Sequence, residues 1–250
     1  MAGGMIAMDV LSLLMAILMY GSSARAAGEV FRITAPVVGT LLAVVVAVLA
    51  FLLTLLLEVA LLHRLFPKPR PGRHKVMKGA AFWGWTLNFV LKRVVYFPPL
   101  RNILYSSNIL RYLSLRALGC NVAFTASMSI DADIMDPSLT TVGPGATLGT
   151  RVLVASHFFE GTELNLARVT IGKDVLLGAD TMLGPGCDIR EGAKVLGRTT
   201  LSLFCTVGEN AKIFPGSHLD SKVVIEPGEV VPPRSYRARA RSENKPEKKD

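Results

Sequence analysis

The chain has 250 residues, half of them hydrophobic, and carries a formal net charge of +9. Its length allows one medium-sized domain with additional segments. Its three cysteines are too few, and odd in number, for a disulfide framework, which favours a reducing compartment. The hydrophobic fraction is high for a soluble protein, and the excess is concentrated at the N-terminus.

Two apolar segments open the chain. The second, Pro36–Leu62, is longer than the about 20 residues that a membrane-spanning helix needs. The first, Met5–Gly21, has the length of a signal peptide, and Ala24–Ala26 resembles a cleavage site. However, no Lys or Arg precedes it, and Asp9 lies inside it. We therefore predict a two-helix transmembrane hairpin over residues 1–65, with a signal peptide as the alternative for the first segment.

The distribution of charge sets the orientation. The loop expected between the two segments holds Arg25 and Arg32, set against Glu29. Between His63 and Gly119 there are eleven Lys or Arg residues and no Asp or Glu. The positive-inside rule therefore places everything after the second span in the cytoplasm.

The basic segment at 66–117 directly follows a span, and its charges are interleaved with aromatic residues. This arrangement favours anionic lipid headgroups over nucleic acid as the partner. The pattern predicts amphipathic helices that lie at the membrane surface and are broken at Pro98–Pro99.

An aliphatic residue then recurs at every sixth position. A period of six fits neither a helix nor a single strand, but it fits a chain wound as a triangular prism with six residues to each face. We predict a left-handed parallel β-helix of hexapeptide repeats over 118–231, with about six coils, followed by a disordered basic tail at 232–250. The aliphatic positions are Val142, Leu148, Val154, Ile171, Leu177, Leu183, Ile189, Val195, Leu201, Val207, Ile213, Leu219, Ile225 and Val231.

The period has two irregularities. Upstream of Val142 the same phase runs back through Ile130, Phe124 and Leu118, and Asp136 is its one failure. Farther on, Val154 and Ile171 are seventeen residues apart, which six does not divide. The second irregularity predicts a loop insertion at 156–170 that leaves a corner of the prism and carries His157 at its base.

The hexad pattern resembles the left-handed β-helix acyltransferase superfamily, whose members transfer acyl groups from thioesters to amines or hydroxyls. The same scaffold serves γ-class carbonic anhydrases, but a zinc site needs about three protein ligands. The predicted prism offers only His157 and His218, so we predict no metal. The usual state of the superfamily implies a homotrimer.

A closer resemblance covers more of the chain. Two spans, then "PGRHKVMKGAAFWGW", "LRYLSLRALG", "IDADIMDPSLTTVGPGATLG", "ASHFFEG" and the hexads, are similar to one unit of the membrane-embedded C-terminal region of ε-poly-lysine-synthetase-type nonribosomal peptide synthetases. That family joins amino acids by amide bonds. The resemblance implies an acyl or aminoacyl donor, carried by CoA or by a phosphopantetheinyl carrier protein as a thioester.

The chemistry of such a transfer needs a base near neutrality, and histidine is the side chain best matched to this task. We predict His157 as the general base, supported by the resemblance, with Glu160 or Glu163 orienting the imidazole. A solvated loop histidine is the alternative. The resemblance also gives Asp131 and Asp136 weight as acceptor-binding residues.

Cations beyond the loop complete the predicted site, with Arg190 and Arg198 as candidates for the donor phosphates. The predicted function is therefore a membrane-anchored acyltransferase. The alternative is a non-catalytic trimeric assembly module of a membrane biosynthetic complex.

Overall fold

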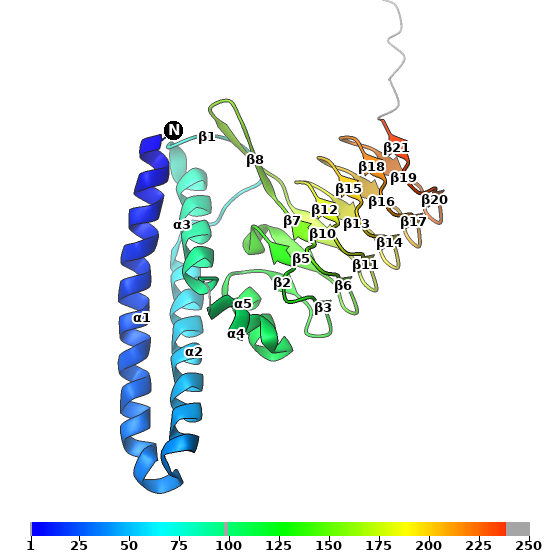
Figure 1. Cartoon of the computed structure of the whole chain (residues 1–250). Coiled ribbons are helices and arrows are strands. Elements are labelled where there is room, and N and C mark those ends of the chain that lie inside the picture. Colours follow the sequence, from blue (N-terminus) through cyan, green and yellow to red (C-terminus); the bar gives the residue numbers. More distant parts are fainter. Residues whose placement is uncertain (1, 98–99, 239–250) are drawn as a thin grey trace, which may run out of the picture.

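Two long antiparallel helices stand at one side of the molecule (Figure 1). The computed structural model describes residues 2–97 and 100–238. Helices α1 (Ala2–Val38) and α2 (Thr40–Leu65) are long and apolar enough to cross a membrane, by length and composition. The chain reverses direction at Gly39, whose φ of 80° is a conformation that glycine adopts without steric cost.

The first helix is longer than the sequence pattern predicted. The expected loop between the apolar segments is helical, because α1 continues without a break to Val38. This stretch is rich in alanine, the best helix former, and its proline, Pro36, lies in the last turn. The charges expected in a loop therefore lie on a helix that runs beside α2.

Three helices connect this hairpin to the repeats: α3 (Gly79–Val95), α4 (Leu100–Ser106) and α5 (Asn108–Ala117). The break expected at Pro98–Pro99 lies outside the described residues. Helix α3 packs against α1 and α2, and α5 packs against α2 and the first coil of the repeats. One continuous hydrophobic core runs from α1 and α2 through α4 and α5 into the prism, so these helices cover its first end.

The predicted parallel β-helix is confirmed, with six coils of three short strands (Figure 1). The first sheet contains β2 (Asn121–Val122), β5 (Thr140–Val142), β10 (Val169–Ile171), β13 (Asp188–Ile189), β16 (Thr206–Val207) and β19 (Val224–Ile225). The second contains β3 (Ser127–Met128), β6 (Thr147–Leu148), β11 (Leu176–Leu177), β14 (Lys194–Val195), β17 (Lys212–Ile213) and β20 (Val230–Val231). The third contains β4 (Asp133–Ile134), β7 (Leu153–Val154), β12 (Met182–Leu183), β15 (Thr200–Leu201), β18 (His218–Leu219) and β21 (Tyr236–Arg237).

The aliphatic residue of each hexad points into the prism. Ile171, Ile189, Val207 and Ile225 stack in register at intervals of eighteen residues, and all are buried. Strand β21 lies beyond the predicted boundary at 231, within the segment expected to be a tail, and residues 239–250 of that segment lie outside the described part of the chain.

The first coil does not follow the predicted phase. Its core residues are Val122, Met128 and Ile134, whereas Phe124 and Ile130, which the extrapolated hexads placed in the core, are exposed. Ile134 pairs with Val154, twenty residues farther on, rather than eighteen. The 3₁₀-helix η1 (Pro137–Leu139) supplies the additional length and shifts every upstream position by two.

The predicted loop insertion is a β-hairpin. Strands β8 (His157–Glu160) and β9 (Glu163–Leu166) are antiparallel, and β1 (Gly72–Lys75), which precedes α3, adds a third strand beside β9. The hairpin leaves the prism between β7 and β10, at the edge where the third sheet leads into the first. Because η1 lies one coil earlier at the same edge, both irregularities of the hexad meet there.

Candidate active site

An aspartate and a histidine form a pair at this edge. Nδ1 of His157 lies 2.7 Å from Oδ2 of Asp136. The same oxygen accepts the backbone N–H of Ser156 at 2.9 Å, and Oδ1 accepts the indole N–H of Trp85 at 2.8 Å. Asp136 is only 5% exposed, so its carboxylate is buried and has a donor on each oxygen.

The ionised form of Asp136 is favoured. Burial by itself raises the pKa of this carboxyl group, but hydrogen bonds from His157, Ser156 and Trp85, together with the charge of the imidazole, outweigh burial and hold the pKa below its usual value. A carboxylate that accepts the Nδ1–H of an imidazole leaves the Nε2 lone pair free to take a proton.

Backbone and hydroxyl contacts fix the pair. The hydroxyl of Thr140 donates to the carbonyl of Asp136 at 3.0 Å and lies 3.3 Å from Oγ of Ser156. The carbonyl of Ser156 accepts the N–H of Ala167, which closes the base of the hairpin. His157 therefore leaves the prism at a position held from both sides.

Aromatic rings surround the imidazole. The ring centroid of Trp85 lies 5.0 Å from that of His157, and those of Phe159 and Phe89 lie at 6.1 and 6.3 Å. Trp85 and Phe89 come from α3, so this helix forms one wall of the site. The His157 side chain keeps 15% of its surface exposed, and within the described part of the chain its Nε2 forms no hydrogen bond.

The hairpin places Glu160 away from the imidazole. Alternate residues of a strand point to opposite faces, so His157 and Phe159 share one face and Phe158 and Glu160 share the other. Glu160 lies 3.6 Å from Arg73, and Glu163 lies 4.0 Å from the same guanidinium. The residue that orients the histidine is Asp136.

The predicted acceptor-binding residues do not lie together. Asp136 is buried and fully engaged with donors. Asp131 lies at the edge between the second and third sheets, where it accepts from the Ser129 hydroxyl at 2.8 Å.

The two predicted donor-binding arginines are also at other edges. Arg198 lies at the edge between the second and third sheets, two coils beyond Arg151. Arg151 itself donates two hydrogen bonds to Asp180 at the same edge. Arg190 lies between the first and second sheets, 3.5 Å from Asp188. Neither is on the edge that carries His157.

A groove of about 490 Å³ lies on the second face of the hairpin. Asn165 lines the groove between its two cross-strand neighbours, Arg73 and Phe158. The prism edge contributes Arg168, Gly186 and Phe204. Asn165 is 6% exposed, and its Nδ2 has no hydrogen-bond partner within the described residues. The groove thus combines two cations, two aromatic rings and a free amide donor.

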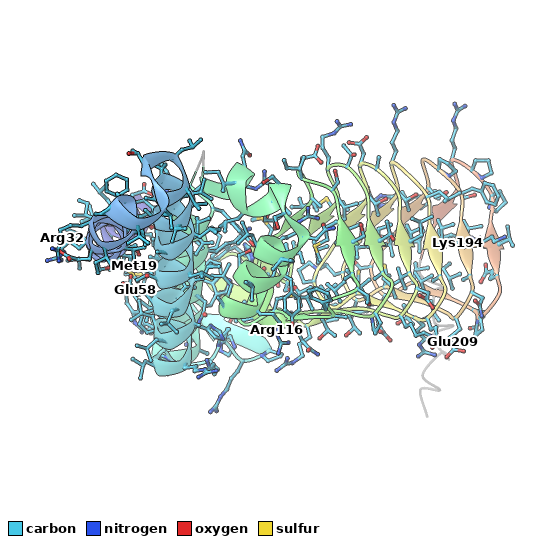
Figure 2. The ribbon with its side chains drawn as sticks, turned by 90° about the horizontal axis from the view of Figure 1, so that it is seen from below. Met19, Arg32, Glu58, Arg116, Lys194 and Glu209 are labelled. Carbon is cyan, nitrogen blue, oxygen red and sulfur yellow. The ribbon has the colours of Figure 1, made fainter. Side chains whose placement is uncertain are left out.

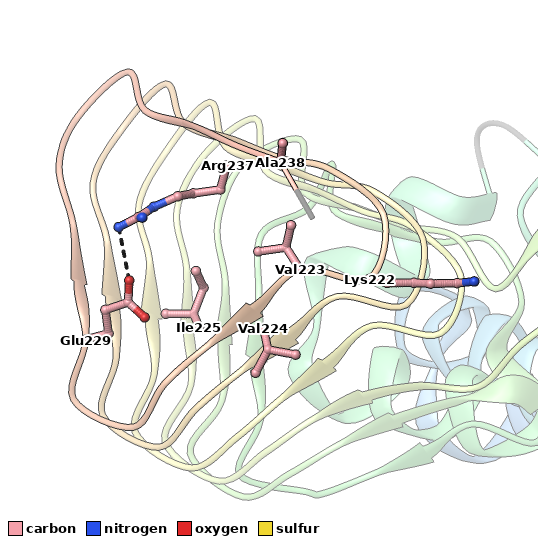
Figure 3. Close-up of a pocket in the computed structure, with 7 residues that line it drawn as sticks. All are labelled: Lys222, Val223, Val224, Ile225, Glu229, Arg237 and Ala238. Atoms are coloured by element: carbon pink, nitrogen blue, oxygen red, sulfur yellow. Dashed lines mark hydrogen bonds and ion pairs between the residues drawn. The ribbon is translucent and has the colours of Figure 1, made fainter. Parts of the chain in front are cut away.

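A second cavity, of about 360 Å³, lies at the far end of the prism (Figure 3). It is formed by the sixth coil, and Arg237 reaches Glu229 across it at 3.1 Å. The hairpin with His157 follows the second coil, so this cavity is separate from the candidate site. Among the described residues, no group of three His, Cys, Asp or Glu side chains is placed to hold a metal ion.

Sequence reasoning missed the role of Trp85, because its aromatic neighbours suggested a membrane surface. A signal for Asp136 was present: it is the position where the hexad fails.

No family model matches the chain. A stretch of 111 residues is 28% identical to the Bacillus subtilis (strain 168) protein named "Putative acetyltransferase YvoF", and the match covers 43% of this chain and 60% of that protein. The chain therefore spans about three fifths of the length of this curated relative.

Solved structures with a similar fold include two bacterial proteins. The hexapeptide-repeat acetyltransferase VCA0836 of Vibrio cholerae is 15% identical, with a TM-score of 0.44 and coverage of 56% of this chain and 84% of that chain. The acetyltransferase domain of PglB from Neisseria gonorrhoeae, in complex with acetyl coenzyme A, is 18% identical, with a TM-score of 0.29 and coverage of 49% and 61%. The repeat and the three-sided coil define this chain as a hexapeptide-repeat β-helix protein.

Proposed function

We propose that the protein is a membrane-anchored acyltransferase that moves an acyl group from a thioester to an amine or hydroxyl acceptor, with His157 as general base. The observation that carries the proposal is the buried Asp136–His157 pair, in which the carboxylate holds Nδ1 and leaves Nε2 free. The match to a curated protein named as an acetyltransferase supports acyl transfer as the reaction.

The residues support a simple sequence of proton transfers. Nε2 of His157 takes the proton of the acceptor as its nitrogen or oxygen attacks the thioester carbonyl. When the carbon–sulfur bond breaks, the imidazolium returns the proton to the departing thiolate, so the base is regenerated. Asp136 stabilises the imidazolium between these steps, and such a base contributes about 10²–10⁴ in rate.

The groove on the second face of the hairpin is the proposed site for the nucleotide end and the pantetheine arm of the donor, with acetyl-CoA as the donor. Because His157 is on the opposite face, the thioester end has to pass the base of the hairpin to reach Nε2. Arg73 and Arg168 supply positive charge for phosphates, which arginine binds in bidentate fashion. The free Nδ2 of Asn165 suits an amide carbonyl of the pantetheine arm, since a buried donor without a partner is costly. Phe158 and Phe204 supply apolar walls. These residues replace Arg190 and Arg198 in our assignment.

Membrane anchoring through α1 and α2 is supported by their exposed apolar surface. Leu41 and Leu57 are 83% and 70% exposed. Burying such a side chain away from water stabilises a protein by about 1.5–3 kcal/mol, and exposure to water loses this free energy. Lipid removes this cost. The basic segment after α2 supports a cytoplasmic location for the prism by the positive-inside rule, and a homotrimer remains our prediction for the assembly.

The first experiment is an acyl-transfer assay with the full-length protein in detergent. Acetyl-CoA is supplied with mixed amines and sugars, and free thiol and acylated product are both measured. His157→Ala is expected to lose turnover by about 10²–10⁴, while His218→Ala, an exposed histidine stacked on Tyr236, serves as the matched control and stays active.

Three outcomes of this assay contradict parts of the proposal. Activity that survives His157→Ala removes the base. Turnover only with a phosphopantetheinyl carrier thioester overturns CoA as donor and favours the amide-forming chemistry of the synthetases that the sequence resembles. No turnover with either donor, from a folded wild-type protein, favours the assembly module.

A further inference from the structure

Helix α1 carries three exposed charges next to an apolar helix. Arg25, Glu29 and Arg32 all point away from the body of the protein, and the Arg32 guanidinium lies 2.8 Å from the Glu29 carboxylate. Figure 2 shows Arg32 on the side of the hairpin that faces away from the β-helix.

The register of the hairpin fixes their depth. The Ser22 hydroxyl donates to Glu58 at 2.7 Å, so these two residues lie side by side. Counting from this contact along the two antiparallel helices, residues 25–32 lie opposite about residues 48–55 of α2. That part of α2 carries no charged residue, and Thr54 is its one polar side chain. If α2 spans the bilayer, the three charges of α1 lie near its middle.

Charged side chains at that depth are costly when they face lipid, and they normally face protein or water. Within one copy, α2 and α3 lie on the other side of α1 and leave these charges uncovered. Glu29 and Arg32 pair with each other, but within the described part of the chain no acidic side chain pairs with Arg25 and no other element covers the three charges.

Two glycines lie on the same face. Gly21 and Gly28 are seven residues apart, close to two helical turns, and alternate along the face with Arg25 and Arg32. A Cβ added to either glycine would meet nothing within 4 Å, so packing within one copy does not require them. Glycine weakens a helix interior relative to alanine, but in membranes small residues let a second helix approach closely.

We propose that this surface, Gly21, Arg25, Gly28, Glu29 and Arg32, here called the charged face of α1, contacts the charged face of a second copy within the membrane. The face carries both signs of charge, so it complements itself. Copies inserted in the same orientation bring equal residues to equal depth, and Arg25 and Glu29 are about one helical turn apart. Arg25 of one copy then reaches Glu29 of the other.

The inference rests on the membrane-anchoring part of the proposed function and is independent of acyl transfer. It is tested by disulfide cross-linking in native membrane vesicles. The three natural cysteines are buried, so the wild type gives the background. Gly28→Cys is expected to form a covalent dimer on oxidation. Leu53→Cys, which is exposed at a similar depth on α2, is the matched control and is expected to remain monomeric.

A charge exchange tests the ion pair. In the Gly28→Cys background, Glu29→Arg is expected to lower the cross-linking yield at least fivefold, and adding Arg25→Glu is expected to restore it. Equal cross-linking at Gly28→Cys and Leu53→Cys, or none at Gly28→Cys, overturns the proposed interface. Extraction of the wild type by alkaline carbonate overturns membrane anchoring and this inference together, while the acyl-transfer assay in detergent judges the chemistry separately.

Discussion

Asp136→Asn is the substitution that tests the site most directly. The two carboxylate oxygens of Asp136 receive three N–H donors, from Trp85, Ser156 and His157. Asparagine has nearly the same shape but only one acceptor oxygen. Whichever way the amide is turned, its NH₂ group faces at least one N–H donor in a buried site.

The two orientations have different consequences. With the amide oxygen toward Ser156 and His157, the NH₂ group faces the indole N–H of Trp85, and two buried donors lack acceptors. With the amide reversed, Nδ1 of His157 must become the acceptor, so Nε2 carries the proton and cannot act as base. An unsatisfied buried donor costs about 1–3 kcal/mol. We therefore expect a loss of about 1–3 kcal/mol in the free energy of unfolding and of about 10²–10⁴ in kcat/KM.

A second substitution separates this account from a general loss of packing. Trp85→Phe keeps an aromatic ring and removes the indole N–H, and alone it costs about 1.5–3 kcal/mol, the value of a hydrogen bond to a charged group. In the Asp136→Asn background it removes the opposing donor instead. The double variant is expected to be more stable than the sum of the single effects by about 1 kcal/mol or more, and to recover about tenfold in kcat/KM relative to Asp136→Asn.

The measurements are denaturant unfolding in detergent and steady-state kinetics with acetyl-CoA for the four proteins of this cycle. Effects that add within about 0.5 kcal/mol, with no recovery of activity in the double variant, would refute the donor clash and with it the role assigned to Trp85.

Three further predictions follow from the same geometry. The pKa of Asp136 is lower in the folded than in the unfolded chain, so its contribution to stability is present above the unfolded pKa and is lost as the pH falls through the folded pKa. The free energy of unfolding, measured from pH 7 downward, should therefore fall below about pH 4, and Asp136→Asn should reduce this fall. The same pH profile in both proteins contradicts the prediction. Gly186→Ala adds a Cβ that overlaps the Phe204 ring. Because this ring lines the groove, its displacement should raise the KM for acetyl-CoA severalfold with kcat little changed. Gly161→Ala, at the open tip of the hairpin, is the control for replacing a glycine with positive φ, and equal KM values for the two variants would remove the groove as donor site. Met128→Ala should lower the free energy of unfolding by about 2–5 kcal/mol, because it is a large-to-small change in the core. Ile130→Ala, at an exposed position two residues on, should change it by no more than about 0.5 kcal/mol. The reverse order of effects would mean that the first coil follows the hexad phase extrapolated from the sequence.

The location of Trp85 links helix α3 to the proposed chemistry. It lies on α3, which packs against α1 and α2, and it donates to the carboxylate that orients the base. Lys92, a buried residue of the same helix, forms an ion pair at 2.8 Å with the partly exposed Asp133 of the first coil. Helix α3 is thus held to the prism at two points. One of them, Trp85, holds the carboxylate that contacts His157, so the candidate site includes a residue of the segment that follows the proposed membrane anchor.

Features that repeat or persist along the chain could be predicted from the amino-acid sequence alone. The six-residue period predicted the parallel β-helix and its core from Val142 onward, because each hexad forms the same face and corner wherever it occurs. The long apolar segments predicted two helices of membrane-spanning length, since length and hydropathy alone decide that property. The break after Val154 predicted where the chain leaves the prism, and it singled out His157.

Features that depend on which residues meet across coils became visible only in the folded structure. The period could not reveal that η1 lengthens the first coil by two residues, so it misplaced Phe124 and Ile130. It also could not show that Asp136, twenty-one residues before His157 in the chain, lies against the imidazole, while Glu160, only three residues after it, points to the opposite face. Contacts of this kind depend on how many residues each coil inserts at one edge and on which helix packs there, and neither is written in the local pattern of the sequence.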